Sequence, residues 1–372
     1  MKTDLRIFLA GDFCSKPSTS QITVSAELKD LIQSCELKVV NFEVPLKPDV
    51  KLPSQKRERF FQNDDAPDFL RGLGFNLFSQ ANNHAFDWGD EGFKKTKAAL
   101  GNAAFGAGTY EEAYRVKVVE VQGVKIGFLA LSFAAYTGVF DDVIKHDGLG
   151  CAYINDLRVN HDIMEAKKQV DYLFILPHDG IEYIDVPLPE TIARYRDFID
   201  YGADGVIGTH PHCPQGWEEY KGKPIFYSLG NFFFNSKETI EYRADKPHWY
   251  EGICVVMTIA DEKLLWEVVN TKNMDNIGLG IDHDKVRNEE NKQLCHYLID
   301  DKAYLEYLQP ILKSQANTDL QSIKRMFLPQ NNKEAITALW HCMKGNKPVS
   351  KDELYFLLKN DLKRRRIIRI FD

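Results

Sequence analysis

The feature that most constrains the fold is the alternation of short apolar runs with amphipathic stretches over about the first 235 residues. Val24–Cys35 and Pro189–Tyr201 carry apolar residues at helical spacing and predict helices. Tyr172–Leu176 is apolar throughout, as expected for a strand that is buried on both faces. Strands and helices that alternate in this way predict sheets covered by helices.

Two pairs of β-rich runs are joined by short turn sequences. Tyr114–Glu120 and Lys125–Ser132 flank Gln122-Gly123, which predicts a hairpin. Gly252–Ile259 and Leu264–Asn270 flank a polar tetrapeptide and predict a second hairpin. Hairpins pair antiparallel strands, so the sequence predicts an α/β fold with mixed rather than purely parallel sheets.

The composition of the sequence changes after about Lys272. Residues 285–372 are rich in Leu, Lys, Glu, Gln and Asn and poor in Gly. They predict short helices at Asn291–Asp300, Lys302–Lys313, Leu320–Phe327, Lys333–Lys344 and Lys351–Leu362. We therefore predict a boundary near residue 275, with an α/β domain at 1–275 and a helical appendage at 276–372. The basic cluster Lys363-Arg364-Arg365-Arg366 with Arg369 is interpreted as a solvated helix end, with binding of an anionic partner as the alternative.

Composition excludes several classes of function. The net charge of −7 provides no global electrostatic reason to bind nucleic acid or anionic lipid. No stretch approaches the ~18 uninterrupted apolar residues of a membrane-spanning helix, so no integral membrane segment is expected. The seven cysteines are scattered without a close pair, which argues against a disulfide framework or a zinc ribbon. We expect a cytoplasmic protein.

The predicted strands share one property, which is that they end in polar residues able to bind metal ions. In open α/β sheets, ligands bind in the crevice outside the carboxyl ends of the strands. Carboxylate, amide and imidazole groups gathered there could hold one or two divalent ions. The residues are Asp12, Glu43, Asn83 with His84, His178, and His210 with His212.

Each of these residues has a simpler interpretation when taken alone. Asp12 could form a turn or cap a helix, Asn83 could lie in an ordinary turn, and a single buried histidine could bond a backbone carbonyl. The segment His210-Pro211-His212 is harder to explain in this way. Pro211 favours an extended His210, and residues two apart in an extended segment point the same way. We therefore expect the two imidazoles to converge.

A series of motifs over about residues 5–235 resembles the CapA family of bacterial poly-γ-glutamate capsule biosynthesis proteins, which are related to the calcineurin-like metallophosphoesterases. The motifs are Gly11-Asp12, Asn41-Phe42-Glu43, Asn82-Asn83-His84 with Asp87 and Gly89, His178-Asp179-Gly180-Ile181-Glu182-Tyr183, Gly208-Thr209-His210-Pro211-His212, and Tyr227-Ser228-Leu229-Gly230-Asn231-Phe232. The resemblance implies a metallophosphoesterase-like αββα sandwich of two mixed sheets. It does not extend to the helical C-terminal region.

The resemblance also implies roles for individual residues. The implied ligands for one or two divalent transition-metal ions (Mn, Fe or Zn) are Asp12, Glu43, Asn83, His178, His210 and His212. His84 would protonate the leaving group and Asp87 would orient it. Cys14 stands where the superfamily pattern has a histidine ligand, which leaves the number of ions open; we favour a packing role for this cysteine. Candidate substrate-binding residues are Glu182, Ser228 and Asn231, with a surface carboxylate and turn chemistry as the alternatives.

From this resemblance we expect a metal-dependent hydrolase that uses a metal-bound hydroxide on a phosphoester or a γ-glutamyl amide. The expected setting is capsule or poly-γ-glutamate metabolism, with a small-molecule or polymeric anionic substrate and capsule-synthesis partners. CapA-like proteins usually carry an N-terminal membrane anchor, and the sequence predicts none here, which favours the enzyme. The alternative is a non-catalytic metal-containing module that binds or helps export an anionic polymer.

Overall fold

The computed structural model describes residues 4–49, 60–134, 138–140, 147–235, 248–274 and 277–327, with side chains up to Ser314 in the last range. The chain divides into two compact units, one within Met1–Phe133 and Thr137–Ile299 and the other within Ala134–Tyr136 and Asp300–Asp372. The predicted helices at Lys333–Lys344 and Lys351–Leu362 and the basic cluster at residues 363–369 lie outside the described residues.

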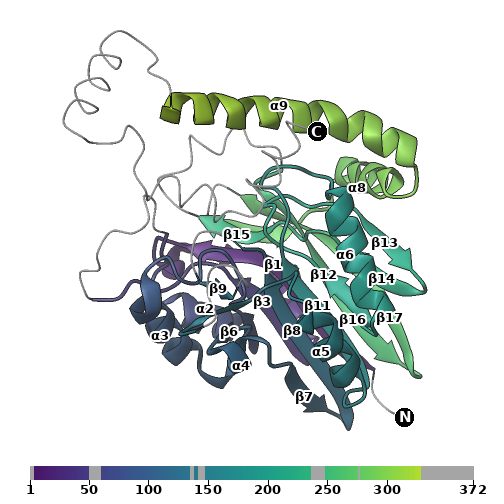
Figure 1. Cartoon of the computed structure of the whole chain (residues 1–372). Helices are drawn as coiled ribbons and strands as arrows, with labels where there is room; N and C mark the ends of the chain where they lie inside the picture. The colour runs from purple at the N-terminus through teal and green to yellow at the C-terminus, as the bar shows by residue number, and fades with distance from the viewer. Residues whose placement is uncertain are drawn as a thin grey trace, which may run out of the picture. The chain divides into compact units, whose positions relative to one another are not determined.

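The first unit contains a nine-stranded mixed sheet in the order β2-β18-β17-β16-β1-β3-β4-β5, with β15 also paired to β1 (Figure 1). The parallel strands β1, β3, β4 and β5 form one half, and the β16–β17 hairpin pairs antiparallel to β1 on the other side. The strands are β1 Leu5–Ser15, β2 Thr23–Val24, β3 Leu37–Phe42, β4 Leu77–Ser79, β5 Ala104–Phe105, β15 Asn231–Asn235, β16 Glu251–Ala260, β17 Lys263–Met274 and β18 Gly278–Ile281.

A second, six-stranded sheet has the order β13-β14-β12-β11-β8-β7. Its central strands β8, β11, β12 and β14 are parallel, and hairpins add an antiparallel strand at each edge. The strands are β7 Lys117–Val121, β8 Val124–Ser132, β11 Tyr172–His178, β12 Gly205–Ile207, β13 Trp217–Tyr220 and β14 Lys223–Phe226. A small sheet joins β6 Ala107–Gly108, β10 Gly150–Ala152 and β9 Val139–Phe140. The two predicted hairpins, at β7–β8 and β16–β17, are confirmed.

Side chains that alternate along the strands pack into two separate layers of the core. Ile7 and Leu9 of β1 belong to the core between the sheets, with Phe128 and Phe174 from the second sheet. Phe8, between them in sequence, belongs to the core beneath α1 and α2. Residues that alternate along a strand point to opposite faces, so each sheet is covered on both sides.

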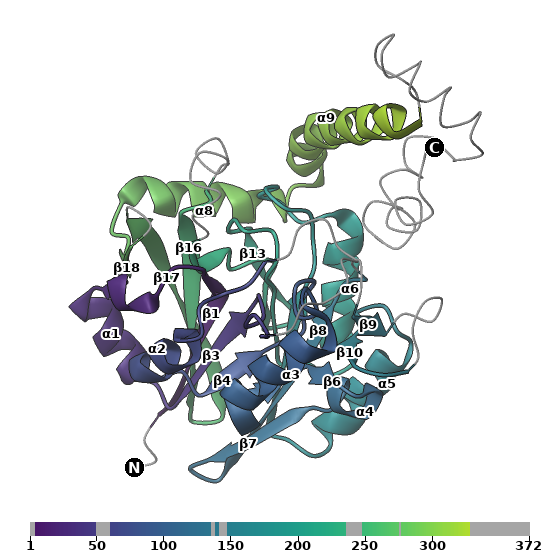
Figure 2. The ribbon, with the colours of Figure 1, turned by 90° about the vertical axis from the view of Figure 1, so that its left-hand side faces the viewer.

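The helices complete the layers. Figure 2 shows α1 and α2 on one side and α5 and α6 on the other. Ser25 caps α1 by accepting a hydrogen bond from the Leu28 N–H, and Gly74 ends α2 in the left-handed conformation. The α-helices among the described residues of this unit are α1 Ala26–Gln33, α2 Ala66–Leu73, α3 Gly89–Leu100, α4 Tyr110–Ala113, α5 Arg158–Lys167, α6 Pro189–Asp200 and α8 Lys285–Tyr297. The predicted αββα sandwich of two mixed sheets is confirmed.

The described residues 285–327 are mostly helical, as predicted, but with different limits, and the region predicted as helical from residue 276 begins with the strand β18 instead. The predicted helix Asn291–Asp300 begins earlier, as α8, and ends before Asp300, whose carboxylate accepts hydrogen bonds from the next helix's first turn. The two short helices predicted within 302–327 are one helix, α9 Asp301–Phe327. Residues 314–319 contain neither Gly nor Pro, so nothing in the sequence stops the helix there.

The first unit extends through β18 and α8 to Ile299. Residue 275 itself lies outside the described residues, and the division of the chain predicted there stays a prediction. Within the described ranges, no helix combines the length and the apolar character needed to cross a membrane.

Candidate metal centre and active site

Asp12 lies within β1, which continues to Ser15 rather than ending at this residue as predicted. Beyond Asp12 the strand pairs with β15 and with the end of β3, and the register shifts at Asp12 on both sides of the strand. A side-chain Cβ at Gly11 would lie 1.9 Å from the Gly230 carbonyl oxygen, so only glycine allows this approach. Such a bulge redirects side chains, and the Asp12 carboxylate accepts a hydrogen bond from the His210 N–H at 3.1 Å.

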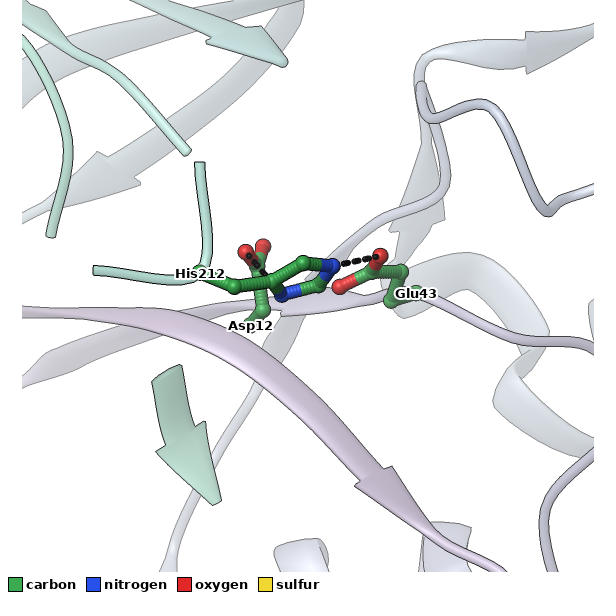
Figure 3. Close-up of side chains that lie close together, drawn as sticks. All are labelled: Asp12, Glu43 and His212. Carbon is green, nitrogen blue, oxygen red and sulfur yellow. Dashed lines mark ion pairs between the residues drawn. The ribbon is translucent and has the colours of Figure 1, made fainter. Parts of the chain in front are cut away.

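A first ligand group brings together Asp12, Glu43 and His212 (Figure 3). One ligand atom from each lies within 4.8 Å of the others. His212 Nε2 is 3.4 Å from Glu43 Oε1, and His212 Nδ1 is 3.6 Å from Asp12 Oδ2. Both carboxylates have no exposed surface, and burial raises the pKa of Asp12 against the opposing effect of His212. Buried carboxylates require nearby positive charge, so this donor set fits a divalent cation.

A second group adjoins the first and contains Asn83, His178 and His210. His178 Nε2 lies 2.9 Å from Asn83 Oδ1 and 3.2 Å from His210 Nδ1. One ring nitrogen can donate only one hydrogen, yet this nitrogen faces two polar atoms. Burial, with the neighbouring His210, holds the pKa of His178 well below its usual value, so its ring is neutral. Neutral imidazole and amide oxygen are donors that a second divalent ion accepts.

The backbone of the His-Pro-His segment differs from the prediction. His210 and His212 have φ angles of 102° and 58°, so the expectation of an extended His210 is wrong. The two rings still converge, with centroids 6.1 Å apart. The Tyr183 N–H bonds the Pro211 carbonyl at 2.8 Å and holds the turn. Residues other than glycine adopt this region at a cost, which surrounding contacts must offset.

His84 and Asp87 form a separate pair beside these groups. His84 Nδ1 lies 2.9 Å from Asp87 Oδ2, which also accepts the Phe60 N–H at 2.9 Å. The other ring nitrogen, Nε2, is 4.0 Å from Glu43 Oε1. A carboxylate beside Nδ1 favours the imidazole tautomer that has its hydrogen on Nδ1. The other ring nitrogen, Nε2, is the one that faces the first ligand group.

The predicted substrate-binding residues lie in different settings. Ser228 is fully buried, donates to the Cys213 carbonyl at 2.8 Å and accepts the Gly230 N–H at 3.1 Å. Asn231 is buried, and its Oδ1 lies 2.9 Å from His212 Nδ1. Glu182 is half-buried in the segment after β11. Ser228 therefore supports a turn and Asn231 an imidazole, while substrate binding by all three stays a prediction.

Cys14 lies in an apolar cluster with Val44, Phe234 and Trp249. It is not a member of the first ligand group, which comprises Asp12, Glu43 and His212. These surroundings agree with the packing role favoured for this cysteine.

Two buried asparagines that had been assigned no role connect the ligand groups. Asn41 Nδ2 donates to Asp12 Oδ1 at 2.7 Å, and Asn41 Oδ1 accepts from Asn82 Nδ2 at 3.1 Å. Asn82 Oδ1 in turn accepts the His84 N–H at 3.1 Å. The two amides therefore link a ligand carboxylate to the segment that carries His84. The only signal in the sequence was their presence in the Asn41-Phe42-Glu43 and Asn82-Asn83-His84 motifs.

The profile of the family described as bacterial capsule synthesis protein PGA_cap matches residues 7–236, which is more than half of the chain. This chain belongs to the PGA_cap family. The resemblance to the CapA proteins is thereby confirmed.

Curated relatives of this PGA_cap chain include two CapA proteins. The capsule biosynthesis protein CapA of Bacillus anthracis is 30% identical over 206 residues, covering 52% of this chain and 49% of the relative. The PGA biosynthesis protein CapA of Bacillus subtilis (strain 168) is 31% identical over 201 residues, covering 52% of each. A probable polyglutamine synthesis accessory protein of Mycobacterium tuberculosis is 28% identical over 205 residues, covering 52% of this chain and 54% of the relative. The chain spans about half the length of these relatives.

Solved structures similar to this PGA_cap chain are more distant. A hypothetical protein from Thermus thermophilus matches 73% of this chain and 100% of its own, at 16% identity and a TM-score of 0.47. A structure described as a novel phosphatase of Mycoplasma pneumoniae matches 73% of this chain and 94% of its own, at 14% identity and a TM-score of 0.44. At these scores, the similarity carries no information about activity.

Proposed function

We propose that this chain is a metal-dependent hydrolase of the capsule synthesis family that acts on a phosphoester or a γ-glutamyl amide in capsule or poly-γ-glutamate metabolism. The observation that carries the proposal is the pair of adjoining ligand groups beside His84 and Asp87. Two buried carboxylates, three imidazoles and an amide meet there from segments far apart in sequence. Such a concentration of metal-binding groups exceeds what packing requires.

The residues divide between two ion sites. Asp12, Glu43 and His212 would hold one ion, and Asn83, His178 and His210 a second, with Mn, Fe or Zn suited to the mixed oxygen and nitrogen donors. When bound, such ions lower the pKa of water and offset the negative charge that develops in hydrolysis. Asn41 and Asn231 hold the ligands Asp12 and His212 in place.

His84 is the proposed general acid. Asp87 holds the hydrogen on Nδ1 and stabilises the protonated ring, so Nε2 can deliver a proton towards the first ligand group. Hydrolysis of a phosphoester releases an alkoxide oxygen, and hydrolysis of an amide releases an amine nitrogen. Both leaving groups require a proton, so this pair serves either reaction.

A second candidate is a non-catalytic metal-containing module that binds or helps export an anionic polymer. The names of the relatives favour it, since one is called an accessory protein and two are called biosynthesis proteins. Partners from capsule synthesis fit either candidate.

The test combines metal analysis with activity. The purified chain would be analysed for bound metal, loaded with Mn, and assayed on a generic phosphodiester and on poly-γ-glutamate. We expect cleavage of one substrate by the wild type and none by Asp12→Ala or His210→Ala. His161→Ala, at an imidazole 69% exposed on α5, is the matched control and should retain activity.

Two outcomes would contradict parts of the proposal. Metal-loaded protein that cleaves neither substrate would support the binding module over the hydrolase. Protein that binds no transition metal would overturn the ligand assignment itself.

A further inference from the structure

Three segments that carry site residues continue into a second cluster of side chains. Lys16, Lys47 and Trp88 each follow a site residue, respectively Asp12, Glu43 and His84, by four positions. All three meet at the ring of Phe61. We call Lys16, Lys47, Phe61 and Trp88 the lysine–aromatic cluster.

The lysine–aromatic cluster concentrates positive charge. Lys16 Nζ lies 5.1 Å and Lys47 Nζ 5.2 Å from the centre of the Phe61 ring. Lys47 Nζ is also 5.1 Å from the Trp88 ring, which meets Phe61 edge to face at 6.1 Å. The faces of aromatic rings attract ammonium groups, so the rings hold both lysines in place. An anion that reached both ammonium groups would be attracted by two positive charges.

The cluster lies on the His84 side of the site. The Trp88 indole N–H donates to the Phe60 carbonyl at 3.0 Å, and the Phe60 N–H donates to Asp87 at 2.9 Å. The Phe60 ring meets the His84 ring edge to face at 5.1 Å. His84 is the proposed proton donor to the leaving group, so the cluster adjoins the leaving-group part of a bound substrate.

We propose that Lys16 and Lys47 form an anion-binding subsite for a carboxylate or phosphate carried by the leaving-group part of the substrate. Lysine ammonium groups bind either anion as point charges, and Lys47 is exposed while Lys16 is half-buried. The inference rests on the proposed hydrolase and adds a substrate preference. Substrates with a second anionic group beyond the scissile bond are favoured over those with a neutral leaving group.

The kinetic test compares leaving groups that differ only in charge. Mn-loaded protein would be assayed on 3-carboxyphenyl and 3-carbamoylphenyl phosphodiesters. It would also be assayed on γ-glutamyl-glutamate and on the analogue in which both carboxylates of the leaving residue are amides. We expect the ratio of kcat/KM for the charged over the neutral substrate to fall by about three- to fivefold in Lys16→Gln and in Lys47→Gln. Lys94→Gln, at a lysine 58% exposed on α3, should leave that ratio unchanged.

Salt and competing anions complete the kinetic test. The wild-type preference should weaken as the salt concentration rises, because salt screens exposed charges. Inhibition by inorganic phosphate or by glutarate would show which anion the lysines favour. An unchanged ratio in both lysine variants would overturn the subsite.

A binding measurement separates failure of the subsite from failure of the proposed hydrolase. If no substrate is cleaved, calorimetry would compare binding of γ-linked triglutamate to wild type and to the Lys16→Gln/Lys47→Gln double variant. Weaker binding by the double variant alone would support the subsite without the hydrolase. Equal binding by the two proteins, or no binding by wild type, would overturn it.

Discussion

Replacing Asn41 with alanine tests whether the buried amides position the metal ligands. Asn41 Nδ2 donates to Asp12 Oδ1 at 2.7 Å, and its oxygen accepts from Asn82. Asn82 Nδ2 keeps a second acceptor, the Phe42 carbonyl at 3.1 Å, in the variant. The loss therefore falls on the Asp12 carboxylate, which is fully buried and has few ways to replace the donor, and on His178 Nδ1, which lies 3.2 Å from Asn41 Nδ2.

The expected magnitude follows from that hydrogen bond. A hydrogen bond to a charged group contributes about 1.5–3 kcal/mol. Each ~1.4 kcal/mol corresponds to a factor of ten in binding. Asn41→Ala should therefore weaken metal binding by about ten- to a hundredfold, which is also the usual range for residues that support metal ligands.

Calorimetric titration of metal-free protein with Mn would measure this change. Asn76→Ala is the matched control, because Asn76 is an exposed asparagine that bonds the backbone at Lys38 and Glu36. It should bind Mn like the wild type. If Asn41→Ala also bound Mn like the wild type, the asparagines would not position the ligands and the reasoning would be refuted.

The remaining predictions concern the general acid, a close strand contact and a surface network. His84→Gln should slow cleavage of a methyl phosphodiester far more than that of a p-nitrophenyl phosphodiester, whose leaving group needs no proton; equal slowing would contradict the acid role. Gly11→Ala should lower the free energy of unfolding in urea by about 3 kcal/mol or more, since its Cβ would meet the Gly230 oxygen. The Glu251 hydrogen bond raises the pKa of His248, so the stabilisation by this pair is full below about pH 6.5 and is lost as the pH rises through the higher folded pKa. His248→Gln should accordingly be least stable relative to the wild type at low pH, as thermal melts between pH 5 and 9 would show.

Local chemistry accounts for what could be predicted of the fold. The apolar spacing in Pro189–Tyr201 and the turn at Gln122-Gly123 depend on neighbouring residues, and both appear in the structure as α6 and the β7–β8 hairpin. Element limits depend on distant contacts. Beyond Asp12, β1 pairs with β15, more than two hundred residues later, and with the end of β3.

In the candidate site, too, some features could be predicted from the sequence and others depend on distant contacts. The proposed ligand residues could be suggested from the sequence because each follows an apolar run, and parallel strands place their carboxyl ends at one edge. The left-handed backbone of His210 could not be predicted, since it depends on contacts with Asp12 and with the Tyr183 segment. Ser228 illustrates the same limit, because a motif position does not reveal that its hydroxyl is used within a turn.

The sequence by itself therefore determined the fold class, the family and the residue types gathered at the strand ends, because these follow from periodicity and from motif order. Only the tertiary structure decided that Asn41 and Asn82 join Asp12 to His84, and that Lys16 and Lys47 meet at Phe61. The physical reason is that hydrogen bonds and ring contacts require distances of a few ångströms. Residues far apart in sequence reach such distances only when β1, β3 and β4 have paired within one sheet.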